Sequence, residues 1–149
     1  HCAAMSQLVD EATQGDTQTK IILRPVVLGD PESYKIATLV LAADVQKAGA
    51  TLLLHRQIMN LSGLPTYDMV KAMAEAQGID VKKAETDTSS DVLRQIIARN
   101  TMMVQDIGFY GVPALVIGDK GFIPQGEMPG VNELRLMIID AKTRLKLIK

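Results

Sequence analysis

Apolar residues recur with helical spacing at the start of the chain. Between Ala3 and Gln14 they fall on one face of an α-helix, and Gly15 ends the pattern. The residues of this face are Met5, Leu8, Val9 and Ala12. We therefore predict a first helix over residues 3–14, with Cys2 at its N-terminus.

The segment Lys20–Val27 predicts a strand buried in a sheet. Its first part is continuously apolar and β-branched, as in strands that are covered on both faces. Pro25 limits the strand, because proline has no N–H to donate to a ladder.

A block of helices is predicted from Glu32 to about Gln105. Asp30 suits an N-cap, Pro31 the first helical position and Glu32 the first turn. The first helix, 32–47, should turn inward Ile36, Leu39, Val40 and Ala43. Two further helices are predicted over 50–60, after Gly49, and over 66–77, between the Gly63-Leu64-Pro65 break and Gly78. A long helix capped by Ser89 or Ser90 should turn inward Val92, Leu93, Ile96, Ile97, Met103 and Val104.

The last third of the chain predicts a hairpin followed by a helix. Pro113 stands at the entrance of a short apolar strand, and Gly118-Asp119-Lys120-Gly121 has the composition of a hairpin turn. The returning strand would be Phe122-Ile123-Pro124. The final helix, Val131–Lys149, should turn inward Leu134, Met137, Ile138, Ala141 and Leu145. Near its C-terminus the cations Lys142, Arg144, Lys146 and Lys149 suit the helix dipole.

This order of elements predicts an α/β fold with a helical insertion. One sheet, with helices on its faces, would be built from residues 1–30 and 108–149, and residues 31–107 would form the inserted helical domain. With 149 residues, 47% of them hydrophobic, and a net charge of −1, the chain reads as one soluble domain without a basic face for nucleic acid. Its apolar runs are too short to cross a bilayer.

Two positions carry candidate chemistry. Cys2 is the single cysteine, and the N-terminus of a helix favours the negative charge of a thiolate; the alternative is an inert terminal residue. The Val112–Pro113 bond is either an ordinary trans bond at a loop–strand junction or a cis bond.

Other candidates favour structure over chemistry. His55 stands in a helical stretch without clustered carboxylates, and the eight methionines fit core packing better than a pliable substrate groove. No metal-ligand spacing is present, and no cofactor is implied.

Three stretches together resemble the DsbA family of thiol–disulfide oxidoreductases, which have a thioredoxin fold with an inserted helical domain. The first, His1-Cys2-Ala3-Ala4-Met5, resembles the second half of the family's Cys-x-His-Cys motif. The second, Asn100–Gly108 followed by Gly111-Val112-Pro113-Ala114, resembles the approach to the cis-proline loop. The third, Gly118–Gly126 with the helix after it, resembles the last hairpin and helix.

The resemblance implies a role for each matching residue. Cys2 would be the resolving cysteine, and His1 would help to stabilise the thiolate of the first cysteine. A cis bond would aim the backbone of Val112 at an extended substrate, while Pro113 shields the sulfurs. The nucleophilic cysteine and the first strand would precede His1, so we expect a chain truncated within the motif and poor at net disulfide transfer.

The expected function is disulfide formation or exchange in exported proteins of the bacterial envelope or periplasm. The expected partners are cysteine-containing substrates and a membrane redox protein, with a possible homodimer formed through a segment before His1, and no nucleic acid or membrane span. Two alternatives remain: a redox-inactive binding or chaperone module, and an enzyme like the kappa-class glutathione transferases. The residue two positions before His1 separates them, since cysteine supports the oxidoreductase, serine the transferase and other residues the binding module.

Overall fold

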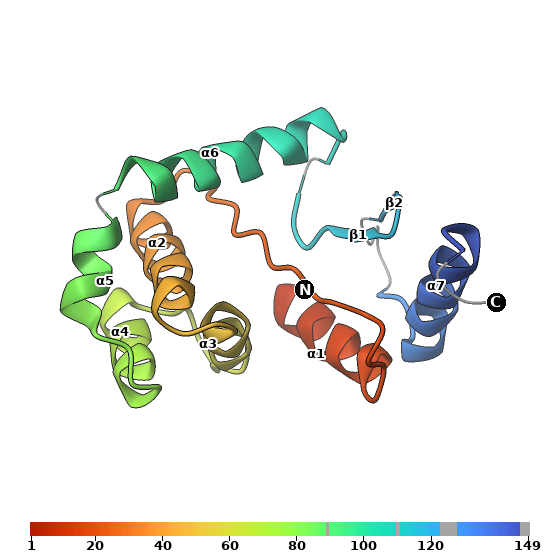
Figure 1. Cartoon of the computed structure of the whole chain (residues 1–149), viewed down its shortest axis with the longest axis horizontal. Coiled ribbons are helices and arrows are strands. Elements are labelled where there is room, and N and C mark those ends of the chain that lie inside the picture. The colour runs from red at the N-terminus through yellow and green to blue at the C-terminus, as the bar shows by residue number, and fades with distance from the viewer. Residues whose placement is uncertain (89, 110, 123–127, 147–149) are drawn as a thin grey trace. The chain divides into compact units, whose positions relative to one another are not determined.

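The computed structural model describes residues 1–88, 90–109, 111–122 and 128–146 (Figure 1). They form two compact units. Unit 1 comprises His1–Ile21 and Gln105–Lys149, and unit 2 comprises Ile22–Val104. The contacts thus assign residues 22–30 to the helical unit and residues 105–107 to the other, across the boundaries predicted from the sequence.

Unit 2 is helical. Its elements are α2 (Pro31–Gln46), α3 (Ala50–Met59), α4 (Tyr67–Ala76), α5 (Val81–Thr88) and most of α6 (Asp91–Asp106). The predicted start of α2 is confirmed, because the Ser33 N–H donates to Asp30 Oδ2 at 2.8 Å. Thr66 caps α4 in the same way, accepting from the Met69 N–H at 3.3 Å.

The core of unit 2 lies where α2 packs against its neighbours. Leu39, Leu54 and Val70 are completely buried there, on α2, α3 and α4 respectively. The predicted inward residues Val40 and Ala43 are buried as well, and Ile36 is partly buried against the same core. This confirms the predicted inward face of α2.

Helices α5 and α6 depart from the prediction. The sequence did not predict α5 as a helix of its own. At its start the Lys83 N–H donates to Asp80 Oδ1 at 3.0 Å. In α6 the prediction that Val92 and Ile96 face inward is wrong, since their side chains are 64% and 39% exposed. Leu93 and Ile97 are buried, and neighbouring positions on a helix lie about 100° apart, so the apolar stripe is wider than the buried face.

The ends of α6 confirm part of the prediction. The Leu93 N–H donates to Ser90 Oγ at 3.4 Å, as predicted for a cap, while Ser89 lies outside the described residues. Met103 and Val104 are half-buried.

Unit 1 contains a two-stranded sheet between helices. Its elements are α1 (Cys2–Thr13), β1 (Leu115–Ile117), β2 (Lys120–Phe122) and α7 (Val131–Arg144). The strands are antiparallel, with Leu115 opposite Phe122 and Ile117 opposite Lys120. The hairpin turn is therefore only Gly118-Asp119, and the returning strand begins at Lys120, before the predicted Phe122. Ile123 and Pro124 lie outside the described residues.

A small core joins the elements of unit 1. Met5 and Ala12 of α1 are buried with Leu134 of α7, and Leu115 and Ile117 of β1 pack against them. Ala141 is buried as predicted, and Met137 and Ile138 are half-buried. Leu145 is 44% exposed, contrary to the prediction, because it lies just beyond the end of α7. Lys149 is outside the described residues.

The predicted strand Lys20–Val27 is wrong. The segment has no regular secondary structure, and Ile22 is 63% exposed. A strand needs a hydrogen-bonded neighbour, and in the described part of the chain the one ladder joins β1 to β2. Instead, the carbonyl of Pro25 accepts a hydrogen bond from Asn100 Nδ2 at 3.0 Å.

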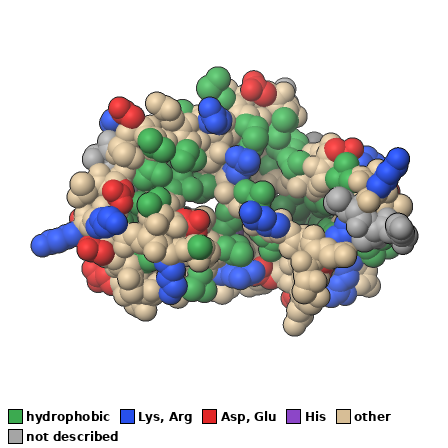
Figure 2. Space-filling model, viewed as in Figure 1, with side chains coloured by type: hydrophobic (Ala, Val, Ile, Leu, Met, Phe, Trp, Pro, Cys, Tyr) green, Lys and Arg blue, Asp and Glu red, His purple; other side chains and the backbone are tan. Residues whose placement is uncertain are grey.

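Charges of both signs lie on the face of the molecule drawn in Figure 2. Lys and Arg side chains lie among Asp and Glu side chains on the face drawn in Figure 2. Of the helices in the described ranges, none has the length and apolar character needed to span a bilayer.

Candidate functional site

Cys2 is the first residue of α1. His1 is the N-cap, and its carbonyl accepts a hydrogen bond from the Met5 N–H at 2.9 Å. Cys2 carries a free thiol and is half-buried, whereas His1 is exposed. The predicted position of Cys2 at a helix N-terminus is confirmed.

The start of α1 suits a negative charge. The first N–H groups of a helix lack partners within it, and the helix dipole is positive at this end. The His1 side chain makes no cap hydrogen bond, and the first turn contains no acidic residue. No carboxylate in the first turn of α1 therefore offsets the positive potential that the helix N-terminus creates around Cys2.

The Val112–Pro113 peptide bond is cis, as the resemblance predicts. Val112 is 47% exposed, and Pro113 is half-buried. One residue, Ala114, separates Pro113 from β1, so the proline leads into the strand without belonging to it.

The described part of the loop before Pro113 contacts the hairpin through an aromatic ring. A Cβ placed on Gly121 would lie 2.5 Å from Cζ and 2.9 Å from Cε1 of Phe109. The ring therefore occupies the space in which any other residue at position 121 would have its side chain. The sequence analysis missed this contact; the only signal for it is a glycine inside a strand, which often marks a close approach.

One core lies beneath both candidate segments. Met5, one turn beyond Cys2, is 2% exposed, and Leu115, two residues after Pro113, packs into the same cluster. All four residues predicted for the site, namely His1, Cys2, Val112 and Pro113, belong to unit 1. The structure connects the two segments through this core, to which Met5 and Leu115 contribute.

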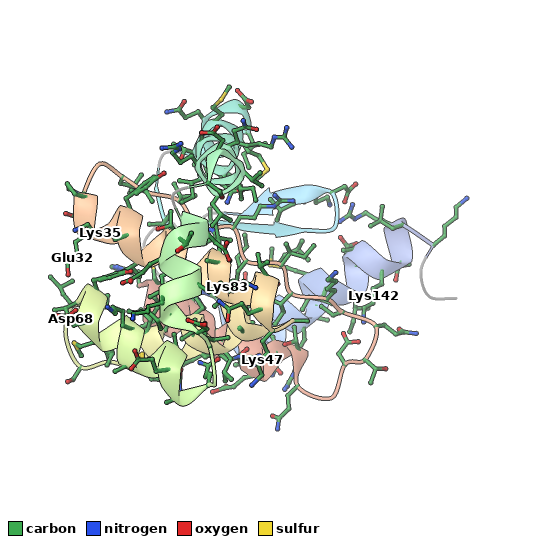
Figure 3. All side chains as sticks on the ribbon, turned by 60° about the vertical axis from the view of Figure 1, so that its left-hand side comes forward. Glu32, Lys35, Lys47, Asp68, Lys83 and Lys142 are labelled. Atoms are coloured by element: carbon green, nitrogen blue, oxygen red, sulfur yellow. The ribbon has the colours of Figure 1, made fainter. Side chains whose placement is uncertain are left out.

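Ion pairs connect α7 to other parts of unit 1. Lys142 of α7, labelled in Figure 3, donates to Asp16 Oδ2 at 2.5 Å. Together with the Thr19 hydroxyl and the Gln18 N–H, it lowers the pKa of Asp16 to about 2. Arg144 pairs with both Asp119 in the hairpin turn and Asp140 on α7, which lowers the pKa of each carboxyl group.

The remaining candidates lie elsewhere. His55 is half-buried on α3, in unit 2, so it does not share a unit with Cys2. Within the described ranges, His, Cys, Asp and Glu side chains form no group of three or more that could hold a metal ion.

Known proteins resemble this chain. Residues 1–135 match the family of DSBA-like thioredoxin domains. The crystal structure of Proteus mirabilis ScsC in a compact conformation has a TM-score of 0.78 at 17% identity, over 97% of this chain and 77% of that one. A thioredoxin-like oxidoreductase from Silicibacter pomeroyi DSS-3 has a TM-score of 0.75 at 23% identity, over 99% and 82%. No curated protein is significantly similar in sequence.

These similarities confirm the predicted fold class, a thioredoxin-like fold with a helical insertion. At such low identities the two solved structures show the fold alone, and the match over residues 1–135 shows the family. This chain belongs to the family of DSBA-like thioredoxin domains.

Proposed function

We propose that this protein is a thiol–disulfide oxidoreductase that acts on exported proteins of the bacterial envelope. The observation that carries the proposal is a free thiol on the first residue of a helix whose core also contains Leu115, two residues after the cis Val112–Pro113 bond. Family membership supports the same chemistry.

Cys2 would act as a thiolate. Its sulfur attacks one sulfur of a disulfide, a new S–S bond forms to Cys2, and the old S–S bond breaks. The leaving sulfur takes the bonding electron pair and is protonated from solvent. In a Cys-x-His-Cys motif, the bond attacked would be the mixed disulfide between substrate and the first cysteine, two positions before His1.

Val112 would receive the substrate chain. It is 47% exposed and precedes β1, which pairs with β2 on one side. No hydrogen bond from another described residue occupies the Val112 backbone. An extended peptide can therefore pair with this backbone as an added strand, with its disulfide directed towards Cys2. We infer two kinds of partner. Cysteine-containing exported proteins would supply the extended peptide, and a membrane redox protein would restore the oxidation state of the cysteines.

A second candidate function is a binding module for extended peptides. The observation that favours it is the exposed Val112 beside β1, because an extended peptide could pair there without any step at sulfur. Such a module would bind a cysteine-free peptide equally well before and after Cys2→Ser.

The test uses a peptide that carries one cysteine as its glutathione disulfide. We expect the folded chain to form a peptide–Cys2 mixed disulfide faster than the same chain in urea, and Cys2→Ser to form none; mass spectrometry locates the adduct. Equal rates for folded and unfolded chains would contradict the proposal. If the cysteine-free peptide binds while no adduct forms, the binding module is supported instead.

A further inference from the structure

We propose that Phe109 and Gly121 form a clamp that positions the Val112 backbone for substrate docking. This inference rests on the proposed function. It assigns these two residues a positioning role and no chemical step.

The clamp follows from the geometry of the hairpin. Gly121 lies opposite Val116 in the β1–β2 ladder, so a side chain at position 121 would point to the same face as Val116. Val116 is 57% exposed, whereas Leu115 and Ile117 pack into the core of the unit on the other face. The Phe109 ring therefore lies on the outer face of the hairpin, above Gly121.

The contact is close enough to need glycine. A Cβ on Gly121 would lie 2.5, 2.9 and 3.7 Å from Cζ, Cε1 and Cε2 of the Phe109 ring. Separations below 3.0 Å force one partner to move. The glycine thus lets the ring rest directly on the strand backbone.

The position of the Phe109 ring affects the loop that contains Val112. Phe109 precedes Val112 by three residues, and Leu115, in the strand that pairs with β2, follows Val112 by three. The chain is thus attached to the hairpin three residues before Val112, by the Phe109 ring on Gly121, and three residues after it, by Leu115 in the ladder. Displacing the ring releases one of the two supports of the backbone that would receive the peptide.

The contact predicts a selective effect of Gly121→Ala. The ring must move aside, but its tip is the end of a side chain that can rotate, so the fold survives. Reaction of Cys2 with the glutathionylated peptide should slow about ten- to a hundredfold, the cost of misplacing a bound reactant by about 1 Å. Reaction with hydroxyethyl disulfide, which has no peptide backbone, should keep its rate.

Two further variants sharpen the test. Phe109→Leu in the Gly121→Ala background shortens the colliding side chain and should restore part of the peptide rate. Gly63→Ala is the matched control, because a Cβ there meets no atom within 4 Å, and both of its rates should equal those of the wild type. A peptide rate unchanged by Gly121→Ala, or an equal loss with both disulfides, would overturn the proposal.

A measurement independent of activity separates this inference from the proposed function. In Gly121→Ala, the NMR amide shifts of Val112 and Ala114 should change, while those of α1 stay as in the wild type. Unchanged shifts at Val112 and Ala114 would overturn the clamp itself. Failure of the wild type to react with the peptide would instead overturn the proposed function, and with it the role of the clamp in docking.

Discussion

Lys142 and Asp16 form an ion pair across 126 positions of the sequence, with 2.5 Å between Nζ and Oδ2. Their side chains are only 12% and 23% exposed. The pair joins α7 to the turn after α1. Side chains of these two helices also meet in the core of unit 1. The ion pair therefore supports the end of α1 opposite to Cys2.

Asp16→Asn should destabilise the protein in a manner that depends on pH. The pKa of Asp16 is lowered from 3.8 to about 2 in the folded chain, so its contribution is fully present above pH 3.8 and is lost as the pH falls through about 2. The urea midpoints of wild type and variant should differ at pH 7 and converge towards pH 2. A difference that stays constant with pH would contradict this role.

The pairing partner supplies the control. Lys142→Met in the Asp16→Asn background should add less destabilisation at pH 7 than Lys142→Met does in the wild type, because the two residues act on one interaction. Additive effects of the two substitutions would show that the pair contributes nothing to stability.

Asn100→Ala should loosen the segment that precedes α2. The Asn100 side chain is 2% exposed and donates to the Pro25 carbonyl at 3.0 Å. Because Pro25 is only half-buried, we expect the free energy of unfolding to fall by about 0.5–1.5 kcal/mol, the net contribution of a typical hydrogen bond. Trypsin should therefore cleave faster after Lys20, whereas Arg99→Ala, at an exposed neighbouring position, should leave the rate unchanged. Equal cleavage rates in all three proteins would refute this tether.

Gly118→Ala should weaken the hairpin. Gly118 has a φ of +64°, and a Cβ there would lie 3.0 Å from Cβ of Ala141 and 3.1 Å from Cδ1 of Leu145. The left-handed conformation alone costs about 1–2 kcal/mol for a residue with a side chain. We expect a lower thermal midpoint than for Gly63→Ala, which meets neither constraint. Equal midpoints for the two variants would show that the turn tolerates a side chain.

Local signals in the sequence predicted most of the fold. Asp30 before Pro31 caps α2 as expected, because caps depend on a few neighbouring residues. The failure at Lys20–Val27 has a different origin. A strand depends on a partner elsewhere in the chain, which apolar content alone does not reveal.

The candidate site was predictable only in part. A single cysteine beside a helical pattern placed Cys2 on the first residue of α1, and the resemblance supplied the cis bond at Pro113. The contact of Phe109 with Gly121 joins a loop residue to a strand residue, and its one local signal, a glycine inside a strand, does not identify the residue that approaches it. Such a contact emerges only when the chain is folded.

The account depends most on Cys2 facing the loop that contains Pro113. NMR of the wild-type protein tests this directly, through nuclear Overhauser effects between the β-protons of Cys2 and the ring protons of Pro113. We predict clear cross-peaks between these protons in the reduced protein. Cross-peaks from Pro113 to other side chains, with none to Cys2, would contradict the proposed site.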